Sequence, residues 1–306
     1  MKLANIDIIF ISYDEPNAEL NYADLLNKAP WAKRVHGVKG SDAAHKAAAQ
    51  LSETDWFITV DGDNQIYKKF LDLDLNLDQD KVKVFSWCGH NIINGLKYGN
   101  GGLKVWNKNF VLNMKTHEDA DSPESQIDFC WEAGYQNFPF VFSDSIVNQT
   151  PYQAWRAGFR EGVKMLTKQG VRVEPEQISS QIYWHNLHRL RIWSSVGMHV
   201  NNGMYAILGA RQGSLRLHDP SWDYYQVRDF EALHEIYKTD VLPIEDNQDA
   251  CIEEIHRLGK ELKLKLGLNW AYFDPTQSSC LIDLYNESIE LGRTYYSKDQ
   301  QWTNSF

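Results

Sequence analysis

Trp56-Phe57-Ile58-Thr59-Val60 is an apolar run that leads directly into Asp61-Gly62-Asp63-Asn64. Residues two apart in a strand share a face, and glycine lets the backbone bend tightly, so the end of this strand presents two carboxylates together. Such a pair suits Mg²⁺ or Mn²⁺ and leaves coordination positions open for phosphate oxygens. The same four residues are also an ordinary turn composition, so the flanking sequence has to decide between the two interpretations.

The residues before this stretch alternate between strand and helix patterns. Residues 6–13 form a nearly continuous apolar run that ends in a polar loop at 14–17. A helix is predicted over 18–29, a short strand over 34–38, and a second helix over 43–51 with Ser41 as its N-cap. This order predicts an α/β fold with a parallel sheet, in which ligands bind at the carboxyl ends of the strands.

A second acidic stretch, from Asp72 to Asp80, also contains Asp-x-Asp but alternates strictly with leucine. That pattern is typical of a half-buried segment whose acids face water. Neither stretch is an EF-hand, because the sixth and twelfth places counted from Asp61 hold Ile66 and Asp72 instead of glycine and glutamate.

Composition narrows the class of protein. The chain has 306 residues and a formal net charge of -10, which argues against a nucleic-acid binder. No segment has the length and apolarity of a signal peptide or a membrane span, so we expect a cytoplasmic protein. We predict a nucleotide-binding domain over 1–170 and a mainly helical region over 171–306. The aromatic residues of the second part fit either a core or a homodimer contact; they include Trp184, Trp193, Trp222 and Tyr224.

Further along the chain, strands are predicted over 82–87 and 138–147, with a glycine-rich segment at 98–106. Its glycines fit either close approach to a ligand or a flexible hairpin. An acidic loop at 116–125 precedes a short helix. Arg156, Arg160 and Lys164 then form one basic stripe on a helix. The stripe fits either pairing with local acids such as Glu161 or contact with a diphosphate.

Taken together, these motifs resemble the GT-A fold glycosyltransferases, and are similar to the family 2 type, over about residues 5–170. The resemblance rests on the strand at 6–13 with its loop, the helix at 43–51, Asp61-Gly62-Asp63, the glycines at 99–102 and the acids before Phe129. It implies a Rossmann-like, mostly parallel sheet flanked by helices. It also implies a nucleotide-diphosphate sugar donor, with a UDP-sugar favoured, a glycan or small hydroxyl acceptor, and Mn²⁺ or Mg²⁺.

The resemblance also implies roles for individual residues. Donor binding falls on Ser12, Tyr13, Asp14, Glu15, His45, Lys46, Asp61, Gly62, Asp63, Gly101, Gly102, Arg156 and Arg160, with Lys104 and Trp106 nearby. Asp61 and Asp63 are the implied metal ligands. Asn148 stands where many relatives place a metal-binding histidine, and His185, His188 and His218 are substitutes. The catalytic base falls on Glu118-Asp119, with Glu124 and Asp128 as alternatives.

Three functions remain open at this point. The first is a metal-dependent glycosyltransferase with Asp61-Gly62-Asp63 as its Asp-x-Asp motif. The second is a sugar-1-phosphate nucleotidyltransferase, although residues 14–17 lack the glycine-rich phosphate loop usual after the first strand of those enzymes. The third is a non-catalytic carbohydrate-binding or assembly protein on the same scaffold. The aromatic residues of the second half and the absence of a histidine at position 148 favour this third function.

Overall fold

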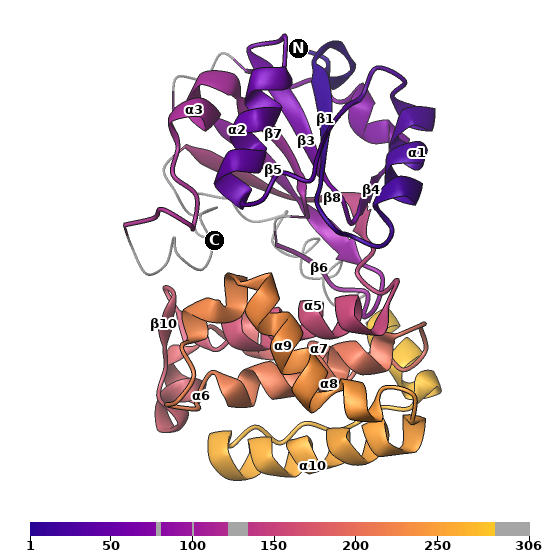
Figure 1. The fold of residues 1–306 in the computed structure, drawn as a ribbon, viewed down its shortest axis with the longest axis vertical. Coiled ribbons are helices and arrows are strands. Elements are labelled where there is room, and N and C mark those ends of the chain that lie inside the picture. The colour runs from indigo at the N-terminus through magenta and orange to yellow at the C-terminus, as the bar shows by residue number, and fades with distance from the viewer. Residues whose placement is uncertain (78–80, 100, 122–133, 285–306) are drawn as a thin grey trace, which may run out of the picture.

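The computed structural model describes residues 1–77, 81–99, 101–121 and 134–284. An α/β part built on one curved sheet lies beside a helical region, as Figure 1 shows. The strands of the sheet are β1 (Asp7–Ser12), β2 (Lys33–His36), β3 (Trp56–Asp61), β4 (Asn64–Ile66), β5 (Val84–Asn91), β6 (Lys97–Tyr98), β7 (Leu103–Asn107) and β8 (Tyr135–Ser145).

The order of the described strands across the sheet is β2-β1-β3-β7-β5-β8-β4, with β6 paired to β5. β1, β2, β3, β5 and β8 run in one direction, while β4, β6 and β7 run in the other. This mixed but mostly parallel sheet, flanked by helices, confirms the predicted α/β class and agrees with a GT-A architecture. The glycine-rich segment contributes the start of β7, which lies antiparallel between β3 and β5.

β1 and β3 are buried on both faces, which explains their continuous apolar runs. Because side chains alternate along a strand, Ile8 and Phe10 enter one apolar cluster, with α1 (Ala18–Lys28). Ile9 and Phe57 enter the cluster on the other face, which includes residues of α2 (Ser41–Leu51) and α3 (Lys108–Asn113). Packing on both faces fixes the direction of β3 and therefore the position of Asp61 at its carboxyl end.

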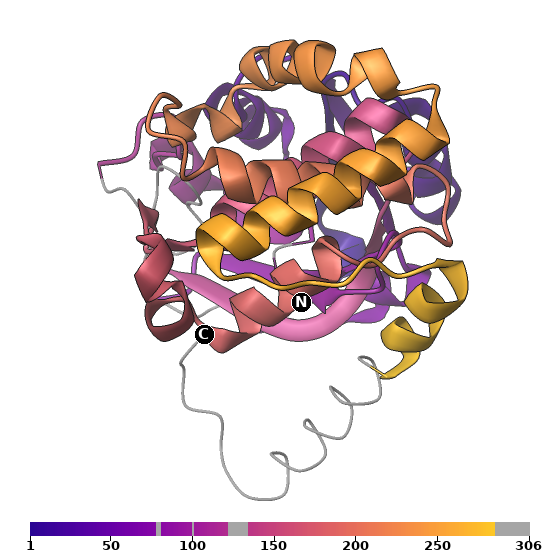
Figure 2. The same cartoon turned by 90° about the horizontal axis from the view of Figure 1, so that it is seen from below.

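The helical region contains α5 (Pro151–Lys164), α6 (Ile178–Gln181), α7 (Trp184–Trp193), α8 (Gly203–Arg216), α9 (Phe230–Asp240) and α10 (Gln248–Leu266). Figure 2 shows α10 crossing this layer on the side away from the sheet. A two-stranded hairpin joins β9 (Thr167–Lys168) to β10 (Val171–Arg172). The prediction of a mainly helical second part is confirmed.

α5 and α8 touch through their backbones. A Cβ atom at Gly158 would lie 2.0 Å from the carbonyl oxygen of Ala206, and one at Gly209 would lie 2.1 Å from that of Trp155. Only glycine permits this approach. α5 therefore shares its core with the helical region, although it precedes the boundary predicted near residue 170. The same core buries Trp193, whereas Trp184 is 78% exposed.

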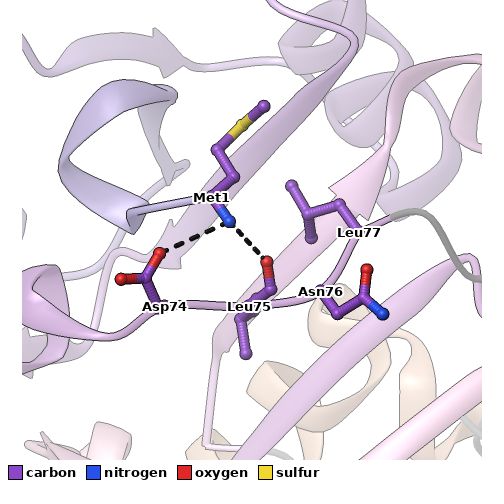
Figure 3. A pocket seen from close by; sticks show the side chains of 5 residues that line it. All are labelled: Met1, Asp74, Leu75, Asn76 and Leu77. Atoms are coloured by element: carbon purple, nitrogen blue, oxygen red, sulfur yellow. Dashed lines mark hydrogen bonds and ion pairs between the residues drawn. The ribbon is translucent and has the colours of Figure 1, made fainter.

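The rival Asp-x-Asp stretch lies at the opposite end of the strands from Asp61. Asp72 and Asp74 are exposed while Leu71 and Leu77 are buried, which confirms the prediction of acids facing water for these two residues. Asp78 and Asp80 lie outside the described residues. The Met1 ammonium donates to the Leu75 carbonyl oxygen at 2.7 Å and lies 3.4 Å from the Asp74 carboxylate. Figure 3 shows these contacts. The residues drawn there line a pocket of about 360 Å³. In the part of the chain described, none of the helices combines the length and apolarity needed to cross a bilayer.

Replacing Gly158 with alanine should destabilise the protein by about 1–3 kcal/mol, because the added methyl group overpacks the α5–α8 contact. At an exposed helix position, alanine is more stable than glycine by about 1 kcal/mol. The variants Glu253→Gly and Glu253→Ala on α10 should show this difference and serve as the control. The measurement is the free energy of unfolding in urea. A gain at position 158 that matches the gain at 253 would contradict the close packing.

Candidate functional site

Asp61 and Asp63 lie at the carboxyl end of β3, where neighbouring structure fixes the backbone on both sides. The Asp61 N–H donates to the Gly102 carbonyl oxygen at 2.9 Å, and the Asp63 carbonyl oxygen accepts from the Ile146 N–H at 2.7 Å. Burial raises the pKa of Asp61. Burial raises the pKa of Asp63 to about 6, and the charge of Asp61 adds to the shift. Two carboxylates are thus held together where their charges are disfavoured.

Glu15 brings a third carboxylate to the same place from the loop after β1. Its Oε2 atom accepts the Tyr13 N–H at 2.8 Å and would lie 2.6 Å from a Cβ atom at Gly62. A side chain at position 62 would therefore displace the Glu15 carboxylate from this place. Burial, followed by the charges of Asp63 and Asp14, raises the pKa of Glu15. The predicted convergence of the β1 loop and the Asp-x-Asp motif is present in the structure.

The glycine segment packs directly on the acidic pair. Gly102 has φ +68°, and a Cβ atom there would lie 2.5 Å from the Asn64 Nδ2 atom and 2.8 Å from the Asp61 Oδ2 atom. A Cβ atom at Gly101 would lie 2.4 Å from the Gly89 Cα atom. The glycines bring the backbone against the carboxylates. Close approach of these glycines to a ligand stays a prediction.

Two cations partly balance the acids. Lys104 is buried on β7, and its charge opposes the rise in the pKa of Asp61. Arg156 on α5 does the same for Asp63. Its guanidinium carbon lies 4.1 Å from the centre of the Phe230 ring. Of the basic stripe, Arg156 therefore acts on the acidic pair.

The predicted phosphate-binding pair on α2 is engaged elsewhere. His45 lies edge-on to the Trp106 ring, with its Nδ1 atom 2.8 Å from the Ser41 carbonyl oxygen. Burial lowers the pKa of His45 to about 4, so this side chain is neutral at physiological pH. Lys46 pairs with Asp42 at 2.7 Å. Donor binding by His45 and Lys46 stays a prediction that these contacts do not favour.

From the loop after β1, Ser12 is buried and Tyr13 is 43% exposed. The Ser12 hydroxyl lies 3.0 Å from the His36 Nδ1 atom and accepts from the Arg34 Nε atom at 2.9 Å. Asp14 is exposed beside Tyr13. The carboxyl end of β1 thus presents one aromatic ring and one acid on the surface, next to the half-buried Glu15.

Asn148 links the site to the helical region. Its Nδ2 atom donates to the Asn201 carbonyl oxygen at 2.8 Å, and its own carbonyl oxygen accepts from Asn202 at 3.0 Å. Of the substitute histidines, His218 has its ring nitrogens 3.1 Å and 2.9 Å from the carbonyl oxygens of Ser214 and Val173. Within the described ranges, no group of three or more His, Cys, Asp or Glu side chains is arranged to hold a metal ion.

A smaller set of donors does fit a hard cation. The Asn64 Oδ1 atom is buried without a hydrogen-bond partner, while its Nδ2 atom donates to Asp63 Oδ1 at 2.6 Å. A buried amide oxygen without a partner costs free energy, and a cation would satisfy it. Two carboxylates and one amide oxygen match the oxygen preference of Mg²⁺ and Mn²⁺. Asp61, Asp63 and Asn64 are the residues that could hold such an ion.

Of the four candidate bases, the structure describes two. The carboxylate of Glu118 accepts the N–H groups of Ser41 at 2.7 Å and Asp42 at 3.1 Å. Asp119 is exposed in the same loop. Glu124 and Asp128 lie outside the described residues. The prediction that Ser41 caps α2 is wrong: Gly40 occupies the N-cap with φ 94°, and Glu118 supplies the missing acceptor.

Some residues of the site carried no local sequence signal. Arg228 donates from Nη1 to the His117 carbonyl oxygen at 2.9 Å, and Phe230 lies under Arg156 and Arg160. Glu161, the suggested partner of the stripe, instead accepts a hydrogen bond from the Tyr98 hydroxyl. These contacts join segments more than 60 residues apart, which no short motif reports.

Comparison with known proteins gives limited matches. No protein-family model and no curated protein sequence matches this chain. A crystal structure of a glycosyltransferase involved in glycosylation of the major capsid of PBCV-1 matches with probability 1.00, TM-score 0.28 and 13% identity, over 43% of this chain and 80% of that one. HddC from Yersinia pseudotuberculosis matches with probability 1.00, TM-score 0.26 and 17% identity, over 44% and 69%.

The raised pKa of Asp63 predicts a pH-dependent stability. The folded protein holds this proton more tightly than the unfolded chain, so stability from the neutral carboxyl is present at low pH and is lost as pH rises from about 4 to about 6. We compare the free energy of unfolding of Asp63→Asn with that of the wild type, with divalent ions chelated. Between pH 4.5 and pH 7.5 this comparison should shift by about 2 kcal/mol in favour of the variant, because only the wild type loses the proton. Urea unfolding at both pH values measures this, with Asp72→Asn as the exposed control. A wild-type-to-variant difference that is equal at both pH values would contradict the burial of Asp63.

Proposed function

We propose that this protein is a metal-dependent glycosyltransferase that moves a sugar from a nucleotide-diphosphate donor, a UDP-sugar by preference, to a hydroxyl acceptor. The observation that carries the proposal is the group of Asp61, Asp63 and Asn64 at the carboxyl end of β3, with buried charge and a buried amide oxygen in need of a cation. The order of the sequence motifs supports the same function.

In this proposal, different residues of the chain bind different parts of the donor. In this proposal the nucleoside binds at the loop after β1, where the exposure of Tyr13 and Asp14 leaves them accessible to a ligand. The charge of Arg156 acts on Asp63, and its planar guanidinium suits the oxygens of a diphosphate. The Phe230 ring and Tyr152 hold that guanidinium in place. Asp61, Asp63 and Asn64 would hold Mn²⁺ or Mg²⁺, which supplies positive charge to the diphosphate leaving group when bound.

In the proposed reaction the acceptor oxygen attacks the anomeric carbon and the bond from that carbon to the diphosphate oxygen breaks. The electron pair of the broken bond stays on the diphosphate. The acceptor proton passes to a carboxylate, a step worth about 10²–10⁴-fold in rate. Asp119 is the candidate we favour, because Glu118 in the same loop is occupied by two N–H groups of α2. A base on the far side of the donor would invert the configuration.

Incubation with Mn²⁺ and a panel of UDP-, GDP- and dTDP-sugars should release nucleoside diphosphate. Asp63→Asn should lower the rate about 100-fold, because it removes one anionic oxygen from the cation site. Asp72→Asn changes an exposed carboxylate of the same type and should leave the rate unchanged. Coupled detection of the released nucleoside diphosphate measures both effects.

Two outcomes would count against the proposal. Release of pyrophosphate from a nucleoside triphosphate and a sugar phosphate would favour the nucleotidyltransferase alternative. Silence across the donor panel, with glycan binding that survives both EDTA and Asp63→Ala, would favour the non-catalytic alternative.

A further inference from the structure

The stretch from residue 177 to residue 218 contains no aspartate or glutamate, in a protein of net charge -10. It includes α6, α7 and α8 and carries four arginines and four histidines. Tyr183 and Trp184, at the start of α7, are 53% and 78% exposed. This stretch is therefore a local exception to the acidic character of the chain, and two of its large aromatic rings face solvent.

His185 joins these two rings into one aromatic group of Tyr183, Trp184 and His185. The His185 and Tyr183 rings are nearly parallel, at an interplanar angle of 7° with their centres 5.5 Å apart. The His185 ring stands at 84° to that of Trp184, with the centres 5.9 Å apart. Because the face of an aromatic ring is apolar, it packs well against the C–H groups of a sugar ring. The aromatic group therefore suits a sugar ligand.

Arg189 lies one helical turn after His185, on the same face of α7. Its guanidinium carbon lies 4.6 Å from the centre of the Tyr98 ring, and its Nε atom is buried without a hydrogen-bond partner. In the part of the chain that the structure describes, Arg189 forms no ion pair. A buried donor without a partner costs free energy, and a guanidinium pairs best with an anion that offers two oxygens. An anionic ligand would therefore satisfy Arg189.

The acid beside Tyr98 does not balance this charge directly. The charges of Glu161 and Arg189 both act on the Tyr98 hydroxyl. The Glu161 carboxylate accepts a hydrogen bond from that hydroxyl and forms no ion pair with Arg189. The Trp193 Nε1 atom donates to the same hydroxyl at 2.7 Å. Tyr98 is thus held in place with its hydroxyl occupied and one side of its ring against Arg189.

Tyr98 also connects Arg189 with the acidic pair. It is the last residue of β6, and Gly102, four residues later, packs against Asp61. Four residues of extended chain span at most about 14 Å. An oligosaccharide that begins beside the acidic pair can therefore reach Arg189 and the aromatic group.

We propose that Arg189 and the aromatic group bind a glycan that carries a carboxylate, as a uronic acid does. The Arg189 guanidinium holds the carboxylate through paired hydrogen bonds, and the exposed rings pack against the sugar faces. One guanidinium balances the single negative charge of a carboxylate. The assignment of this glycan as the acceptor rests on the proposed function, whereas the binding site itself does not.

Calorimetric titration of the full chain with trisaccharides of galacturonate or glucuronate tests the site, with the neutral galactose and glucose trisaccharides beside them. We expect at least one acidic trisaccharide to bind about tenfold more tightly than its neutral counterpart, and Arg189→Gln should remove this preference. Trp184→Ala should weaken both forms about tenfold and keep the preference. Neither variant should change UDP binding.

Arg191→Gln is the matched control, because Arg191 is exposed on the same helix but points away from the Arg189 face. It should keep both the affinity and the preference. If Arg189→Gln unfolds at a lower temperature than the wild type, Trp184→Ala still tests the site, since the Trp184 side chain is exposed and its removal leaves the core intact.

Equal affinity for acidic and neutral trisaccharides, or a preference that persists in Arg189→Gln, would overturn the proposal. A dimer in sedimentation velocity that Trp184→Ala dissociates would also overturn it, because a second copy of the chain would then cover the aromatic group. A separate titration with UDP and Mn²⁺ distinguishes the two levels of inference. Binding of the acidic trisaccharide without UDP binding would support the glycan site and contradict the proposed function, and UDP binding without trisaccharide binding would do the reverse.

Discussion

The structure of the site depends on the burial of two like charges side by side at the end of β3. Burial and mutual repulsion both raise the pKa of Asp63, and burial raises that of Asp61. A fold can keep such a pair only if nearby groups offset the cost, and Lys104 and Arg156 do so within the protein. The cation that we propose at this site would offset it further. The neighbouring glycines follow from the same constraint, because Gly62 and Gly102 leave no room for a Cβ atom between the carboxylates and their surroundings.

The helical region takes part in this arrangement. Arg156 is on α5, and α5 is held against α8 through glycine contacts that fix its position and rotation. Asn148 and the Asn17–Gln153 hydrogen bond of 3.1 Å join the sheet edge to the same helices. A change deep in the α5–α8 contact would therefore move a charge beside Asp63.

Much of the fold could be predicted from the sequence, because the central strands β1 and β3 are buried on both faces and are seen in the sequence as unbroken apolar runs. The place of Asp61 and Asp63 at the end of a buried strand could be predicted, because Gly62 and the preceding apolar run form a local pattern. The antiparallel position of β7 could not be predicted, since Gly101 and Gly102 fit a loop as well as a strand start. The Glu118 cap on α2 was missed because its acceptor comes from 77 residues away, whereas Ser41 had the right residue type in the right place. Phe230 and Arg228 are recognisable only once the chain has folded.

Calorimetry of UDP and GDP binding, with and without Mn²⁺, tests the central claim most directly. If Asp61, Asp63 and Asn64 hold a cation together with a nucleoside diphosphate, Mn²⁺ should tighten binding of at least one nucleotide by about tenfold or more. Asp63→Asn should abolish that increment while the protein remains folded. Nucleotide affinity that is the same with and without Mn²⁺, or the absence of any binding heat, would contradict the account.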